Sequence, residues 1–354
     1  MNSVGFESLQ EDVIRANLCT ACGTCIGACP KGSLEFDVDT EEPVLTGDCN
    51  SCGICYAACP GADIPLPQLD RFLFSRERRV DKELLGIFTN LRKGYATDSS
   101  IRKNATSGGC TTAILVYALE EGLIDGAIVA GTDSKCPWRP TPILATTKAE
   151  VLAASQSKYA LVPNNILLHE VERKNLNKVC VVGLPCHIEG IRKMQMSGKS
   201  NKLASRIKYT IGLLCAMNRS YKATEHVIRS TTNRPLNSIA KYEYRGGPES
   251  QDCVITFRDG STEIVPRTII LQTMDIIPRD RCKGCWDFSS ELADISVGDI
   301  FLPMPMVRLP KYTSMITRTE AGETLIYGAE KSGYIRTSPL AESGFSYNGG
   351  LALK

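Results

Sequence analysis

Two copies of one cysteine pattern lie near the start of the chain, and each copy ends at a proline. Both read C-x2-C-x2-C-x3-C-P, the first from Cys19 and the second from Cys49. Soft thiolates at this spacing bind the 4Fe–4S clusters of bacterial-type ferredoxins, in which the fourth cysteine of each run binds the other cluster. The sequence therefore predicts one cluster on Cys19, Cys22, Cys25 and Cys59, and a second on Cys49, Cys52, Cys55 and Cys29.

Zinc sites and disulfide frameworks are the alternatives for so many cysteines. Zinc sites usually use paired C-x2-C units rather than triple runs with a distant fourth ligand. The chain has sixteen cysteines and no early basic stretch that leads into a long apolar one, so we expect a reducing compartment. These features favour iron–sulfur clusters, which carry electrons one at a time.

The overall composition is that of an ordinary globular protein. Of 354 residues, 43% are hydrophobic and 23% are charged, and the formal net charge is +2. This balance gives no reason to expect nucleic acid as a partner, and the apolar windows are too short to span a bilayer. We therefore expect a cytoplasmic protein without a transmembrane segment, either free or peripheral to a membrane complex.

The order of patterns along the chain predicts two folded units. We expect a two-cluster ferredoxin domain over 1–66, a charged linker helix over 67–90, a second domain over 91–340 and a C-terminal tail over 341–354. The second domain alternates helical and strand patterns at first and is mainly β in its later part. The predicted fold class is mixed α/β, or α+β, with a mixed sheet.

Short apolar segments in the second domain predict buried strands that are followed by helices. These strands are expected over 127–130, 178–182 and 209–215, and a helix is expected over 109–121. Further on, an Asp259-Gly260 turn separates strand patterns over 252–258 and 262–264. Loops at strand ends often carry functional sites in α/β domains, so the residues after the buried strands are site candidates.

Four more cysteines occur in the second domain at positions suited to a shared site. Cys186 and Cys215 each follow or end a predicted strand, and Cys282 and Cys285 form a C-x2-C pair. Convergence of the four thiolates would complete a third 4Fe–4S site, with zinc as the main alternative. Free cysteines are also common as small buried residues, so spacing alone leaves the role of Cys186 and Cys215 open.

A turn of small residues precedes the helix expected over 109–121. Ser107, Gly108, Gly109 and Thr111 would place backbone N–H groups at a helix N-terminus, which suits a phosphate. The segment matches neither a Walker motif nor G-x-G-x-x-G. Taken alone, a plain N-cap and turn is the commoner explanation.

Several motifs together resemble one family, the β subunits of coenzyme F420-reducing hydrogenases and F420-dependent dehydrogenases. The resemblance is carried by the ferredoxin unit and then by Ser107-Gly-Gly, Ser157-Lys158-Tyr159, Gly183-Leu-Pro-Cys186, Gly212-Leu-Leu-Cys215, Cys282-x2-Cys285 and Asp294-Ile-Ser-Val-Gly-Asp299. The two-cluster N-terminal extension makes the layout most similar to the input subunit of F420H2 dehydrogenases.

The resemblance implies a flavin iron–sulfur oxidoreductase. Family members bind FAD, exchange a hydride between this flavin and the deazaflavin coenzyme F420, and pass single electrons through 4Fe–4S clusters. It implies a third cluster on Cys186, Cys215, Cys282 and Cys285, and FAD contacts from Ser107, Gly108, Gly109, Thr111, Lys158 and Tyr159. Lys158 and His187 are the candidates for catalytic or orienting groups, although hydride transfer between two bound rings depends mainly on their placement.

The resemblance also implies coenzyme F420 as a substrate, and a redox partner protein or ferredoxin at the N-terminal clusters within a larger complex. Basic residues that could receive the acidic tail of F420 are Arg102, Lys103, Arg192, Lys193, Arg279, Arg281 and Lys283. Because the family includes 7-hydroxymethyl chlorophyll a reductases, a ferredoxin-dependent reductase of an organic substrate is an alternative. A non-catalytic electron relay is the other. The direction of electron flow stays open.

Overall fold

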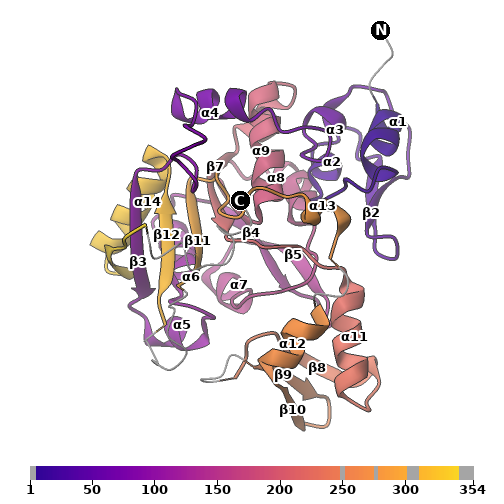
Figure 1. Ribbon diagram of the computed structural model, residues 1–354, viewed down its shortest axis with the longest axis vertical. Helices are drawn as coiled ribbons and strands as arrows, with labels where there is room; N and C mark the ends of the chain where they lie inside the picture. The colour runs from indigo at the N-terminus through magenta and orange to yellow at the C-terminus, as the bar shows by residue number, and fades with distance from the viewer. Residues whose placement is uncertain (1–4, 248–251, 275–277, 301–310, 343–354) are drawn as a thin grey trace.

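The computed structural model describes residues 5–247, 252–274, 278–300 and 311–342. Within these residues the chain forms an N-terminal cysteine-rich unit and a larger α/β unit, and a small sheet lies at one end of the larger unit (Figure 1). The predicted class, mixed α/β with a mixed sheet, is confirmed. The tail predicted over 341–354 lies almost entirely outside the described residues.

The N-terminal unit is closed by a short helical segment and one hairpin. Helix α1 (Phe6–Leu9) continues into a π-helical turn over Gln10–Ile14, and their apolar side chains pack toward the cysteines. Strand β1 (Leu34–Asp37) pairs antiparallel with β2 (Glu42–Leu45). This hairpin separates the two cysteine runs.

Each cysteine run passes through a single turn of helix, α2 (Thr24–Gly27) in the first run and α3 (Ile54–Ala57) in the second. A glycine in the left-handed region precedes each turn, Gly23 with φ 82° and Gly53 with φ 72°. A residue without Cβ adopts this conformation at little cost. The two runs therefore fold as a structural repeat.

The larger unit is built on one mixed sheet. Among the described residues, its eight strands lie in the order β13-β3-β12-β11-β7-β6-β4-β5. The central strands β11, β7, β6 and β4 are parallel, and antiparallel strands flank them on both sides. The bounds are β3 Asn90–Ala96, β4 Gly126–Thr132, β5 Pro140–Ala145, β6 Val179–Gly183, β7 Ile207–Leu213, β11 Ile295–Asp299, β12 Thr313–Thr317 and β13 Ile335–Pro339. The strands predicted near residues 127, 178 and 209 are thus confirmed as β4, β6 and β7.

Helices cover both faces of this sheet. One face carries α6 (Cys110–Glu120), α7 (Lys148–Ala153) and α14 (Glu320–Lys331), and the other carries α8 (Leu168–Arg173), α9 (Pro185–Ser197) and α10 (Asn201–Ala204). The core on the second face also includes Ala28 and Ala58 of the N-terminal unit, so the two units share one apolar core. No helix among the described residues is long and apolar enough to cross a membrane.

A small antiparallel sheet forms the end of the larger unit opposite α4 and α9 (Figure 1). Its strands are β8 (Ile239–Glu243), β9 (Cys253–Phe257) and β10 (Thr262–Val265). Helices α11 (Tyr221–Thr231) and α12 (Arg267–Met274) pack against it. The predicted turn between β9 and β10 is confirmed, with Gly260 at φ 83°.

The prediction of a linker helix over 67–90 is wrong beyond its first part. Helix α4 spans Leu66–Phe74 and ends at Ser75, which has φ 57°. Beyond it Arg78 turns back and pairs with the buried carboxylates of Asp70 and Glu291. The residues that follow form turns, in which the N–H groups of Lys82 and Glu83 donate to the Arg79 carbonyl. The pair with Glu291 joins positions far apart in the chain, and no local sequence pattern contains that information.

Two glycines bring the N-terminal unit into direct contact with the larger unit. A Cβ on Gly27 would lie 1.9 Å from the carbonyl oxygen of Asn165, and a Cβ on Gly190 of α9 would lie 2.2 Å from Oγ1 of Thr24. Side chains larger than hydrogen cannot fit at either point without separating the units.

We expect Gly27→Ala to loosen the two units, because overpacking of this kind costs about 1–3 kcal/mol. Limited proteolysis in the connecting segment 75–89 measures the effect, and the variant should be cleaved faster than the unmodified chain. Gly122→Ala is the control, because its Cβ would meet no atom within 4 Å and adds only local backbone strain. Equal cleavage rates in the two variants would contradict the tight contact.

Candidate functional site

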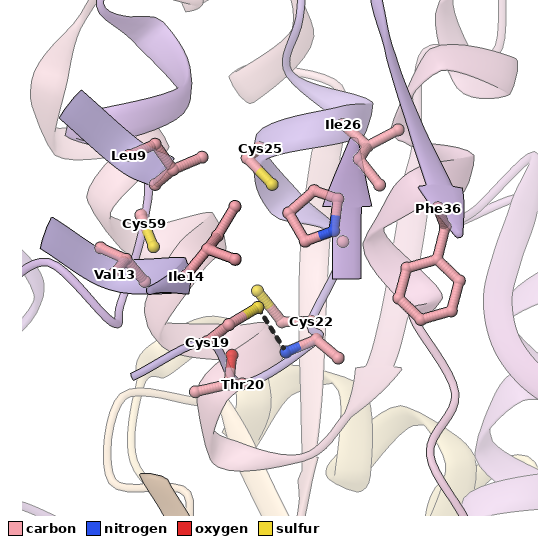
Figure 2. A pocket seen from close by; sticks show the side chains of 13 residues that line it. Leu9, Val13, Ile14, Cys19, Thr20, Cys22, Cys25, Ile26, Phe36 and Cys59 are labelled. Atoms are coloured by element: carbon pink, nitrogen blue, oxygen red, sulfur yellow. Dashed lines mark hydrogen bonds between the residues drawn. The ribbon is translucent and has the colours of Figure 1, made fainter. Parts of the chain in front are cut away.

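Four cysteines from the two runs line one cavity in the N-terminal unit. Cys19, Cys22 and Cys25 come from the first run and Cys59 from the second, and Figure 2 shows their side chains turned toward the same space. The remaining walls are mainly apolar and include Leu9, Val13, Ile14, Ile26 and Phe36. The structure therefore brings together the four residues that the sequence predicts for the first cluster.

A second cavity is lined by the other four cysteines, Cys29, Cys49, Cys52 and Cys55. Cys49 and Cys52 are exposed, whereas Cys22, Cys25 and Cys59 of the first set are buried. The first set thus faces the interior of the protein, and the second reaches the surface.

The thiols of the first set are held close enough to repel one another once ionised. Burial raises the pKa of the Cys25 thiol, and the neighbouring thiolates of Cys59 and Cys22 raise it further. Burial and the same kind of repulsion raise the pKa of Cys59 to about 12. Cysteine thiols bind metals only after they lose their proton. Bound iron would therefore supply the positive charge that this site lacks.

Within the described ranges, no three His, Cys, Asp or Glu side chains are arranged to hold a single metal ion. The first two cysteine sets instead each line a cavity. Four separated thiols around such a space suit a polynuclear cluster, and the donor set fits 4Fe–4S.

The four cysteines of the larger unit meet where parallel strands end. Cys186 lies in the first turn of α9 after β6, and Cys215 follows β7. Cys282 lies on α13 (Asp280–Lys283), and Cys285 follows two residues beyond it. Burial raises the pKa of the Cys186 thiol, and the thiolates of Cys22, Cys215 and Cys282 raise it further. Cys186 therefore interacts electrostatically with Cys215, Cys282 and Cys22, and Cys215 interacts in the same way with Cys285.

Asn218, which lies beside the third set, has a buried side-chain donor without an acceptor in the part of the chain that the structure describes. Its backbone N–H donates to Sγ of Cys282 at 3.3 Å, and its Oδ1 accepts from the N–H of Arg219. The side-chain Nδ2 is buried and has no hydrogen-bond partner among the described residues. Buried donors are nearly always paired, and the sulfides of a bound cluster would offer acceptors there.

The Ser107-Gly108-Gly109 turn packs against the sheet and leads into helix α6. A Cβ on Gly108 would lie 2.4 Å from the carbonyl oxygen of Gly94, so this glycine allows the turn to rest on the sheet. Gly109 has φ 81° and precedes α6, whose N-terminus has no side-chain cap. The N–H of Cys110 donates to Oγ1 of Thr313 at 3.5 Å, and the next N–H, that of Thr111, is available in the way that a phosphate site requires.

Three of the recognised motifs meet at this turn. The N–H of Ser157 donates to Oγ1 of Thr106 at 3.0 Å, which joins the Ser157-Lys158-Tyr159 loop to it. The Tyr159 hydroxyl accepts from Arg245 at 3.0 Å. The same Arg245 pairs at 2.5 Å with Asp299, the last residue of β11. The structure therefore gathers the predicted flavin-contacting segments in one place.

Lys158 itself acts as a cap in this structure. Its Nζ donates to the carbonyl oxygens of Ala154, Ser155 and Gln156 at 2.7, 2.6 and 3.1 Å. Burial lowers the pKa of Lys158 to about 7, but three carbonyl acceptors require all three ammonium protons and so favour the charged form. The amine is engaged with its own loop after α7.

Both ring nitrogens of His187 are hydrogen-bonded to the backbone. Its Nδ1 accepts from the N–H of Leu184 at 2.9 Å, which assigns the ring proton to Nε2, and this donates to the Val162 carbonyl at 2.9 Å. Burial lowers the pKa of His187 to about 4, so the ring is neutral. Neither nitrogen is left for a substrate in this arrangement, and the ring instead fixes the turn that carries Cys186.

Known proteins resemble the chain over most of its length. Family profiles for the coenzyme F420 hydrogenase/dehydrogenase β subunit match residues 92–169 with its N-terminal part and 176–343 with its C-terminal part. The coenzyme F420 hydrogenase subunit beta of Methanosarcina barkeri is 33% identical over 265 residues, which cover 74% of this chain and 86% of the relative. The chain belongs to the family of coenzyme F420 hydrogenase/dehydrogenase β subunits. The resemblance predicted from the motifs is confirmed.

Further comparisons extend this assignment of the family to the N-terminal unit and to the fold. A 4Fe–4S dicluster domain profile matches residues 11–60. A subunit of the F420H2 dehydrogenase of Methanosarcina mazei is 27% identical over 317 residues, covering 88% of this chain and 82% of the relative. A chain of the F420-reducing NiFe hydrogenase complex from M. barkeri matches with a TM-score of 0.62 and 32% identity, over 77% of this chain and 90% of that chain.

Some basic residues of this family member do not lie where the sequence suggested. Arg192 and Lys193 were expected on a surface patch, but both are buried on α9. Arg192 pairs with Asp294 at 3.0 Å, which in turn accepts from Thr210. Asn218 and Arg245 carry no spacing signal and were not predicted as site residues, because only the fold brings them to the motifs.

The crossed assignment of cluster ligands predicts which cysteine variants share a phenotype. We expect Cys59→Ser and Cys19→Ser to lose the same electron paramagnetic resonance signal, and Cys49→Ser and Cys29→Ser to lose a different one. Each variant should lose about four of about twelve irons per chain. A shared signal loss in Cys59→Ser and Cys49→Ser would contradict the crossed ligand sets.

The capping role of Lys158 predicts a stability defect. Lys158→Met should lower the free energy of unfolding by about 1–3 kcal/mol, because three buried carbonyls lose a charged donor. Urea unfolding followed by circular dichroism measures this, with the exposed Lys174→Met as control. Unchanged stability together with lost flavin or substrate binding would instead assign Lys158 to the ligand.

Proposed function

We propose that the chain is a flavin iron–sulfur subunit that exchanges a hydride between coenzyme F420 and FAD. It relays the electrons singly through three 4Fe–4S clusters to or from a partner protein. Membership of a family whose named relatives are F420 hydrogenase and F420H2 dehydrogenase subunits supports the choice of substrate. The arrangement of the three cysteine sets is the observation that carries the proposal.

The first set, whose cysteines are the most buried of the three sets, would link the third set to the second. Cys186 of the third set interacts electrostatically with Cys22 of the first set. Cys25 of the first set interacts in the same way with Cys55 of the second. The second set ends at the exposed Cys49 and Cys52. A partner protein that exchanges electrons with this subunit would therefore dock over the second set.

The segments around α6 fit the phosphates of FAD. The uncapped N-terminus of α6 with Ser107, Gly108, Gly109 and Thr111 would hold a phosphate, and Tyr159 would line the adjoining wall. When bound, the flavin would supply the conversion between a two-electron hydride and the single electrons that clusters accept. His187 and the buried pair of Arg192 and Asp294 would keep α9 and the third set in place beside it.

The experiment that tests this function uses the chain purified without oxygen. We expect about twelve irons and one FAD per chain, and oxidation of reduced F420 when a one-electron dye is present. The return of the visible absorbance of F420 measures the reaction.

Other outcomes would favour the alternatives. Flavin that is reduced by ferredoxin but not by reduced F420 would indicate a reductase of another organic substrate. Clusters without any FAD would indicate an electron relay. About eight irons per chain would remove the third cluster from the proposal.

A further inference from the structure

The larger unit holds the first cysteine set by its backbone. Three of the four cysteines in this set accept, through their carbonyl oxygens, a hydrogen bond from a residue outside the N-terminal unit. The pairs are Asn165 N–H to Cys22 at 3.1 Å, Lys193 Nζ to Cys59 at 2.6 Å, and Arg279 Nε to Cys19 at 3.0 Å. Two of these three donors are cations.

The second cysteine set has no such contacts. Among the hydrogen bonds of the described residues, none joins Cys29, Cys49, Cys52 or Cys55 to the larger unit. The Sγ of Cys49 accepts from the N–H of Ser51, which belongs to the same run. The two sets therefore differ in charge environment although their sequences are nearly repeated.

Of these two cations, Lys193 has the positive charge that is less compensated by nearby carboxylates. Its side chain is only 3% exposed, and its Nζ donates to the carbonyl oxygens of Cys59 and Asp63 and to the carboxylate of Asp63. That Asp63 side chain is 63% exposed, so water screens its negative charge. The buried ammonium is screened far less, and a positive field remains at Cys59.

The positive charge of Arg279 is compensated more completely than that of Lys193. It pairs at 3.4 Å with the buried carboxylate of Glu41, which also accepts from Ser220 and from the N–H of Tyr221 at 2.7 Å each. The Nε of Arg279 nevertheless donates directly to the Cys19 carbonyl. Its field at the first set should be weaker than that of Lys193.

We propose that Lys193, assisted by Arg279, is a positioning residue that raises the reduction potential of the first cluster. The inference rests on the proposed function, because it needs a cluster on Cys19, Cys22, Cys25 and Cys59. Reduction adds one electron to a cluster, and a buried cation near its ligands stabilises the added negative charge. The repeat at the second set lacks such a cation among the described residues, so the larger unit adjusts one of two otherwise similar clusters.

The test is a redox titration of the full chain, purified without oxygen and followed by electron paramagnetic resonance. The first cluster is identified as the signal that Cys59→Ser loses. We expect Lys193→Met to shift the midpoint potential of this cluster to a more negative value and to leave the second cluster unchanged. Lys193→Arg, which keeps the charge, should stay near the unmodified value, and Arg279→Gln should give a smaller shift in the same direction.

Lys31→Met is the matched control, because Lys31 is an exposed cation that lines the second cavity. Water screening should keep both potentials near their original values in this variant. An intact first-cluster signal with an unshifted potential in Lys193→Met would overturn the inference, as would an equal shift in Lys193→Arg. If Lys193→Met loses the cluster, Arg279→Gln becomes the test. A shift of the first-cluster potential to a more negative value in that variant supports the inference, and no shift or a positive shift overturns it. Absence of cluster signals from the unmodified chain would instead overturn the proposed function.

Discussion

Repulsion between thiolates in a confined space is the interaction on which the rest of this structure depends. Twelve cysteines gather in three sets, and burial together with neighbouring thiolates raises the pKa of Cys25 and Cys186. Such a site is costly unless positive charge enters it. Iron would supply most of that charge, and Lys193 and Arg279 contribute cations at the edge of the first set.

The close contact between the two units follows from the same requirement. Electron transfer between sets needs them near one another, and the glycines Gly27 and Gly190 allow the first cysteine run to approach α9 and the turn at Asn165. The shared core around Ala28 and Ala58 then makes the N-terminal unit part of the larger fold. The first set is therefore held against Cys186 by packing as well as by hydrogen bonds.

Much of this organisation could be predicted from local spacing. The cysteine repeat specified two sets with crossed membership. The strand patterns over 178–182 and 209–215 indicated that Cys186 and Cys215 lie at strand ends, as they do in β6 and β7. Features that depend on distant partners could not be predicted. Beyond α4, Arg78 pairs with Glu291, 213 positions away. Strand β3 has a largely polar sequence, and its strand conformation depends on pairing with the distant strands β12 and β13. Lys193 looked like a surface lysine because its acceptors, Cys59 and Asp63, belong to another unit.

In the proposed function, electrons from reduced F420 reach the exposed second cluster through the third and first sets. Rapid mixing of the chain with reduced F420, followed by freezing and electron paramagnetic resonance, measures this route. We expect the signals of the N-terminal clusters to appear in the unmodified chain, and to be strongly delayed in Cys186→Ser while the flavin is still reduced. Appearance of both N-terminal signals at an unchanged rate in Cys186→Ser would contradict it.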